Sequence, residues 1–256
     1  MKLLDHFDRT NNVTHILYRL KNGEWSKLLG KFPDEFRKCY ITDTTLTNLS
    51  SDLGLTKSEY LDKYVIPDRP NVLSGDFGEI LSYWAVRDNF HTKKIPVVGP
   101  KKWLFKNDKN NAVKGADALL FHRINPTKPS KKDLLISIES KMKAVASTDH
   151  RIQEAVNGAT LDKKTRMAKT LIWLEEKHAR EGDKDLVKYI QRYNDPATHG
   201  IFKKEFKAIA IVDQTLEAGE TGKAFTNPQN VTVIVFSIED LKKAYQDTRT
   251  NILKSV

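Results

Sequence analysis

The sequence predicts an α/β fold in which helices flank a mixed central sheet, and three observations support this prediction. Stripes of apolar residues at helical spacing alternate along the chain with strand-like runs. The runs 206–212 and 231–236 are continuously apolar, as expected of strands covered on both faces. The run 134–142 places Glu139 and Lys141 on one face of a strand and apolar residues on the other.

Composition limits the class of protein. The 256 residues include 43 Lys and Arg against 33 Asp and Glu, a net charge of +10 that favours polyanions such as nucleic acid. Many basic proteins bind no nucleic acid, so charge alone leaves both readings open. Cys39 is the only cysteine, which excludes an intrachain disulfide and a zinc cluster of thiolates. The sequence shows no secretory signal and no membrane span, so we expect a cytoplasmic protein.

Residues 1–70 are expected to form a small N-terminal α+β accessory unit, separate from a domain of residues 71–256. The run 14–18 alternates like a strand, and Asn22-Gly23 marks a turn. Thr56 and Glu59 have the spacing of a capping box and predict a helix near Tyr60. Pro67 and Pro70 close the unit.

The larger domain begins with a helix predicted over 74–89. Strands follow near 95–105, 116–124 and 134–143 and are expected to form an antiparallel meander. A long helical stretch over 149–180, with a potential break at Asn157-Gly158, precedes a helix over 185–193. After the two apolar strands, a last helix is expected to start at Ser237, with Asp240 in the capping-box position.

The strongest candidate site combines Glu139 and Lys141 with Asp117. An acid two residues before a lysine occurs five times, but three of these pairs fall in helical stretches, where the two side chains point apart. Glu205 and Lys207 open a strand without a preceding strand headed by an acid. Asp117 heads the strand before Glu139, and a hairpin-like return would bring the two carboxylates together. The alternative reading of Glu139 and Lys141 is an ion pair on an exposed strand.

These residue types suit phosphodiester hydrolysis. Asp117 and Glu139 would hold Mg²⁺ (or Mn²⁺), which prefers hard oxygen ligands and keeps places for water and phosphate. Lys141 would position the attacking water and offset negative charge. Glu79, on the preceding helix, is the weaker candidate for completing the metal ligands.

Lysines gather around the predicted strand 95–105 and could line a phosphate-binding rim, with Lys101, Lys102 and Lys114 as the main candidates. Lys143 and Gln153 are further candidates for DNA contact. A solvated loop surface is the alternative, and nothing here reads base edges. Trp103 and Phe105 are expected to pack in the core rather than stack on bases. No phosphate-binding loop is present, so no nucleotide is expected to bind this chain, and any ATP dependence would come from a partner.

The order helix, three strands, helix, strand, with the acid and the Glu-x-Lys pair in these places, resembles the PD-(D/E)xK nuclease superfamily over residues 74–213. The segments 75–79, 115–117 and 139–141 resemble HamA, the nuclease family of the Hachiman antiphage defence system. This resemblance implies a restriction-endonuclease-like sheet, metal-dependent DNA cleavage by Asp117, Glu139 and Lys141 with help from Glu79, and a partner helicase, HamB, that restrains the nuclease. Some superfamily branches carry Gln-x-x-x-Tyr on the next helix; Gln153 matches the first position, whereas Asn157 stands in place of the Tyr. Ala116 likewise replaces the superfamily's proline.

The sequence therefore predicts a Mg²⁺-dependent deoxyribonuclease without sequence specificity that acts in antiphage defence. A non-catalytic nucleic-acid-binding or helicase-regulating subunit with the same fold is the alternative. An RNase with the same metal chemistry is a third reading.

Overall fold

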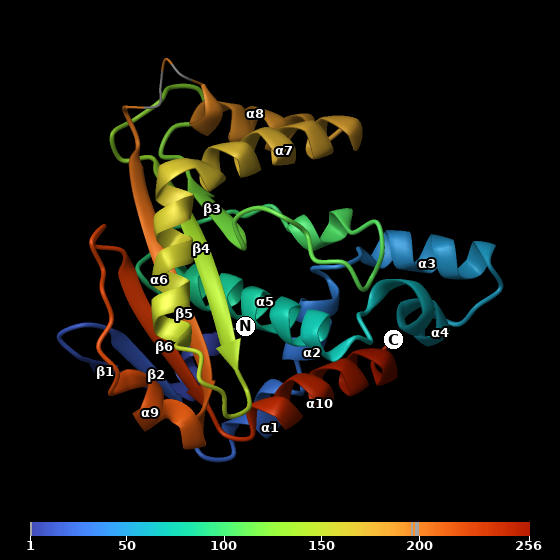
Figure 1. The fold of residues 1–256 in the computed structure, drawn as a ribbon. Helices are drawn as coiled ribbons and strands as arrows, with labels where there is room; N and C mark the ends of the chain where they lie inside the picture. Colours follow the sequence, from blue (N-terminus) through green and yellow to red (C-terminus); the bar gives the residue numbers. More distant parts are fainter. Residues whose placement is uncertain (1, 196, 198–199) are drawn as a thin grey trace.

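A computed structural model describes residues 2–195, 197 and 200–256, and its centre is a six-stranded sheet with helices on both faces (Figure 1). The strand order is β1-β2-β6-β5-β4-β3. The strands are β1 (Phe7–Asn11), β2 (Ile16–Leu20), β3 (Ala118–His122), β4 (Leu134–Lys143), β5 (Lys203–Asp213) and β6 (Thr232–Ile238). The sheet mixes parallel and antiparallel pairs, which confirms the predicted fold class.

Helical elements connect these strands. The α-helices are α1 (Glu24–Leu28), α2 (Phe32–Arg37), α3 (Asp43–Asp52), α4 (Lys57–Tyr60), α5 (Pro70–Thr92), α6 (Arg151–Leu161), α7 (Met167–Arg180), α8 (Lys184–Asn194), α9 (Glu217–Thr221) and α10 (Leu241–Lys254). Short 3-10 helices are η1 (Leu3–His6), η3 (Lys102–Phe105) and η5 (Gln214–Leu216), and π-helical turns are η2 (Leu61–Val65) and η4 (Asp162–Arg166). No helix of the described residues is long and apolar enough to cross a membrane.

The middle of the sheet is parallel. β5 pairs with β4 on one side and with β6 on the other. Helix α5 packs on one face through a core that includes Phe77 and Ile80, and α6 packs on the other through Ala155 and Val156. Because both faces are covered, residues 208–213 of β5 and 233–238 of β6 are buried, as predicted for these apolar runs, while 206, 207 and 232 are half-buried.

The predicted strand over 95–105 is wrong. Only Val98 bridges to β3, opposite Phe121, and residues 102–105 form the turn η3. The chain leaves the sheet at Gly99-Pro100, because proline has no backbone N–H to donate. A side chain at Gly99 would also lie 2.6 Å from the Leu119 carbonyl oxygen, so the backbone passes too close to β3 to carry one. The antiparallel pairing of β3 with β4 is confirmed.

The long helical stretch after β4 is confirmed, although it is interrupted elsewhere than expected. Helix α6 runs through Asn157-Gly158 without a break. The irregularity lies in η4, a π turn that joins α6 to α7. The last helix also starts later than predicted: β6 continues to Ile238, and Asp240 has a left-handed backbone conformation with φ 48° and no side-chain cap. The N–H of Leu241 is satisfied instead by Asp213, 2.9 Å away.

The N-terminal residues extend the same sheet. β1 and β2 form a hairpin, and β2 pairs in parallel with β6. The capping box of Thr56 and Glu59 is confirmed at the start of α4. The division of the chain at residue 70 coincides with the start of α5 and stays a prediction, since both parts share one sheet and one core cluster.

Candidate active site

The site forms where β3 is shorter than β4. β3 pairs with β4 only as far as Ala118 opposite Ile138, so beyond that point no described strand covers this edge of β4. Asp117, the residue just before β3, fills the gap by accepting a hydrogen bond from the Ser140 N–H at 2.8 Å. Because no strand of the described residues pairs with this edge of β4, side chains from both faces of the sheet can approach Asp117.

Glu139 lies on the α6 face of β4 and is held by two cations. Its Oε1 is 2.5 Å from the Lys141 ammonium, and Arg166 of η4 binds its Oε2. The side chain of Glu139 is 2% exposed, whereas that of Lys141 is 34% exposed, so solvent reaches the site through the lysine. The predicted pairing of Glu139 with Lys141 on one face of a strand is present.

Glu79 approaches from α5, on the opposite face. Its Oε2 accepts a hydrogen bond from the indole N–H of Trp103 at 2.9 Å and lies 3.1 Å from the buried ammonium of Lys102. Lys102 is also 3.7 Å from Asp117 Oδ1, so it links the two carboxylates. Trp103 is buried, as expected, and orients Glu79 besides packing in the core.

The carboxylates influence one another electrostatically. Burial raises the pKa of Glu139 to about 7, and repulsion by Asp117 adds to the effect. Burial likewise raises the pKa of Glu79 to about 8, again with a contribution from Asp117. Lys102 opposes the rise in the pKa of Glu79, and Lys141 and Arg166 oppose that of Glu139. Asp117 thus disfavours the charged forms of Glu79 and Glu139, and a bound divalent cation would relieve this repulsion.

The chemistry of these side chains suits a divalent cation. Asp117, Glu139 and Glu79 offer hard carboxylate oxygens, and the side chains of Asp117 and Glu79 are 12% and 17% exposed. Mg²⁺ commonly uses one or two carboxylates and fills its remaining places with water and phosphate. Within the described residues no three His, Cys, Asp or Glu side chains are already drawn together as metal ligands. Lysine and arginine side chains and N–H donors already contact oxygens of these carboxylates, so the metal assignment stays a prediction.

Two residues that support the site had no place in the sequence prediction. Arg166 bridges Glu139, the carbonyl oxygen of Gly158 at 3.0 Å, and Asp162. Asp162 is buried and accepts a hydrogen bond from Ser137 at 2.7 Å, which fixes η4 against β4. The spacing of Asp162 and Arg166, four apart in a helical stretch, is the only sequence signal for this link.

The predicted DNA-binding residues lie in different environments. Lys102 is buried against Glu79 and Asp117, and Lys143 is buried against Glu220 at 2.7 Å. Lys101 donates to the Lys38 carbonyl oxygen, and Gln153 bonds Asn157 and residue 226. Lys114 alone of the five is fully exposed. Their role in DNA binding stays a prediction.

The family model described as HamA matches residues 2–254 of this sequence, which is almost the whole chain. None of the curated proteins compared with the sequence matches it. The matched range includes every residue of the site and the N-terminal hairpin.

Proposed function

The chain belongs to the HamA family and is thus a component of Hachiman antiphage defence, and from this premise we propose that it is a Mg²⁺-dependent deoxyribonuclease. It hydrolyses DNA phosphodiester bonds without sequence specificity. A partner helicase of the same defence system restrains it. Mn²⁺ is the expected substitute for Mg²⁺, because both accept carboxylate oxygens.

The observation that supports this proposal is the meeting of side chains from both faces at the free edge of β4. Asp117 holds the edge, Glu139 comes from one face and Glu79 from the other. Two buried carboxylates with raised pKa values beside a third acid in one site are the pattern expected of a functional site.

Each side chain has a defined part. Asp117 and Glu139 would hold the metal, with Glu79 beside them, and the bound ion would activate water and neutralise charge on the phosphate. Lys141, the most exposed of the charged groups, is placed to orient the attacking water and to offset negative charge on the scissile phosphate. Its small ammonium suits this role, because it turns easily between Glu139 and a phosphate oxygen.

The test is cleavage of supercoiled plasmid by the purified chain in Mg²⁺, in EDTA, and after Asp117→Asn. We expect cleavage by the wild type in Mg²⁺ only and none by the variant. Asp108→Asn is the matched control, because Asp108 is an exposed acid in the nearby loop and, among the described residues, its carboxylate accepts a hydrogen bond only from the backbone N–H of Asn110, at 2.6 Å. Cleavage by Asp117→Asn at the wild-type rate would refute the proposal.

A second candidate is a non-catalytic DNA-binding subunit that regulates the helicase. The observation that favours it is that Lys141 and Arg166 already occupy both oxygens of Glu139, as in a purely structural ion cluster. It predicts salt-sensitive DNA binding that persists in EDTA and no cleavage with any divalent ion. An RNase would instead degrade RNA, and not plasmid DNA, in the same assay.

A further inference from the structure

A cleft of about 560 Å³ opens beside the candidate active site, between the loop after η3 and helix α7. We call it the α7 cleft. Its lining consists of Phe105, Asn107, Ala112, Val113, Lys114, Gly115, Arg166, Lys169, Thr170, Trp173 and Lys177. The lining contains four cations and no acid, and its volume is in the range of clefts that bind small ligands or single chains rather than large bodies.

The α7 cleft joins the candidate active site directly. Arg166 lines the cleft and also binds Glu139. One helical turn further along the same wall, the hydroxyl of Thr170 accepts the N–H of Ala116 at 2.9 Å, which ties the segment before Asp117 to α7. Gly115 is needed at this contact, because its φ is 116° and a side chain there would lie 2.8 Å from the Thr170 hydroxyl.

Lys114, Lys169 and Lys177 have no acidic partner among the described residues, whereas the fourth cation of the cleft, Arg166, is paired with Glu139 and Asp162. Lys114 and Lys169 are exposed and form no hydrogen bond or ion pair with the residues that the structure describes. Lys177 lies 5.8 Å from the ring centre of Trp173 and has no carboxylate within reach in the described part of the chain. Unpaired cations along one cleft are the arrangement that neutralises phosphates and releases counterions.

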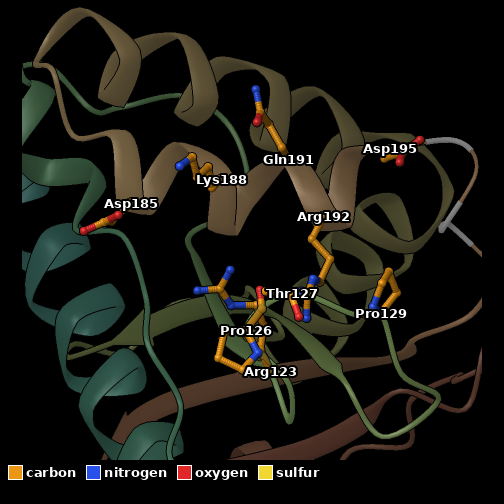
Figure 2. Close-up of a pocket in the computed structure, with 9 residues that line it drawn as sticks. All are labelled: Arg123, Pro126, Thr127, Pro129, Asp185, Lys188, Gln191, Arg192 and Asp195. Atoms are coloured by element: carbon orange, nitrogen blue, oxygen red, sulfur yellow. The ribbon is translucent and has the colours of Figure 1, made fainter.

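Another cavity shows the contrast. The space of about 640 Å³ between α8 and the loop 123–129 is lined by both signs of charge (Figure 2). Lys188 and Arg123 face it together with Asp185, and Arg192 there binds the Asn125 carbonyl oxygen at 2.6 Å. Its mixed charges do not favour a polyanion.

The aromatic side chains of the cleft indicate whether it suits single-stranded or double-stranded nucleic acid. Trp173 and Phe105 are half-buried, line the cleft and meet edge to face with ring centres 5.7 Å apart. A cationic groove with aromatic rings is the usual site for unpaired strands, because exposed bases stack on the rings while phosphates meet the cations. Paired bases have no free faces to stack.

We propose that the α7 cleft binds a single strand of nucleic acid and leads it to Glu139, with phosphates on Lys114, Lys169 and Lys177 and a base on Trp173. This inference rests on the proposed nuclease function and deepens it, since it names an unpaired strand as the form of substrate that enters the site. Arg166, at the inner end of the cleft, contacts the strand where it reaches the carboxylates.

The experiment measures binding of a fluorescein-labelled oligo(dT) by anisotropy in EDTA over a range of salt. The double variant Lys114→Gln/Lys169→Gln loses two phosphate contacts, so the slope of log affinity against log salt becomes shallower by about 1.4. Lys31→Gln/Lys242→Gln is the matched control: both lysines are exposed, lie outside the cleft and form no ion pair with described residues. We expect its slope to equal that of the wild type.

A second readout tests stacking. Oligo(dT) should quench the fluorescence of Trp173, and Trp173→Phe, which keeps an aromatic ring for packing, should remove that quenching. An unchanged slope in the lysine variant would overturn the proposal. Equal affinity for a blunt duplex would overturn the assignment to a single strand.

These results are separable from those of the nuclease assay. Binding in EDTA involves no hydrolysis, so a protein that binds oligo(dT) through the cleft but never cleaves refutes the nuclease and leaves the binding surface standing. A protein that cleaves DNA, yet whose lysine variant keeps wild-type affinity and slope, refutes the cleft alone.

Discussion

Gly158 allows α6 to approach Glu139, and replacing it with Ala should displace the carboxylate without removing any charged group. A Cβ at Gly158 would lie 2.3 Å from Glu139 Oε1, 2.4 Å from Cδ and 2.6 Å from Cγ. Ordinary contact begins near 3.4 Å, so the carboxylate or the helix must move by about 1 Å. A misplacement of about 1 Å at a reacting centre costs about 100-fold in rate.

The effect of Gly158→Ala on stability should be opposite in sign to that of an ordinary Gly→Ala substitution in a helix. Ala in a helix interior stabilises by about 0.5–1 kcal/mol relative to Gly, whereas overpacking costs about 1–3 kcal/mol, so Gly158→Ala should be destabilised by about 1 kcal/mol. Gly75→Ala is the matched control, because Gly75 also lies inside a helix and a Cβ there meets nothing within 4 Å.

The assay is the initial rate of plasmid nicking in Mg²⁺, with urea unfolding as the measure of stability. We expect the nicking rate of the folded Gly158→Ala protein to be about 100-fold lower than that of the wild type, and that of Gly75→Ala to be unchanged. A folded Gly158→Ala protein that nicks DNA as fast as the wild type would refute the placement of Glu139 at the reacting centre.

Two further predictions concern buried charges. Lys102→Met leaves the carboxylates of Glu79 and Asp117 without their shared partner, so above about pH 8, where Glu79 is ionised, the free energy of unfolding should fall by about 3 kcal/mol in urea titrations. Lys101→Met, next to it and half-exposed, should change it little. An unchanged urea midpoint for Lys102→Met would contradict the ion pairs. Burial lowers the pKa of His178, so the folded protein disfavours its proton; the stability it contributes is present above the unfolded pKa of about 6.5 and is lost as pH falls through the folded pKa. His178→Gln should therefore flatten the decrease in unfolding free energy below about pH 6.5 by at most about 1.4 kcal/mol per pH unit. If the unfolding free energy of His178→Gln depended on pH as steeply as that of the wild type, His178 would not be the group responsible.

The sequence predicts the fold well where local signals are strong. Three predictions that depend on neighbouring residues alone are confirmed. They are the alternating run of β4, the apolar runs of β5 and β6, and the capping box at Thr56. The prediction fails at 95–105, because apolar and aromatic residues there resemble a strand while Gly99-Pro100 turns the chain away from the sheet. Periodicity cannot show such a departure.

The candidate site is only partly visible in the sequence. Alternation along β4 places Glu139 and Lys141 together, and the acid heading the previous strand points to Asp117. The roles of Lys102 and Arg166 depend on contacts between distant segments, 102 with 79 and 166 with 139, which no local pattern encodes. Asn157-Gly158 has the composition of a potential helix break, whereas the missing side chain of Gly158 makes room for Glu139 within an unbroken helix.

The central claim is that Glu139 and Lys141, beside Asp117, hydrolyse DNA with a divalent ion. The most direct measurement is cleavage of supercoiled plasmid in Mg²⁺ by the double variant Glu139→Ala/Lys141→Ala, with circular dichroism to show that it is folded. Glu205 and Lys207 form the matched control pair, with the same spacing on β5 and a distance of 2.8 Å between their charged atoms. We expect no cleavage by the folded Glu139→Ala/Lys141→Ala variant and cleavage at the wild-type rate by the control, Glu205→Ala/Lys207→Ala. Cleavage by both variants at the wild-type rate would contradict it.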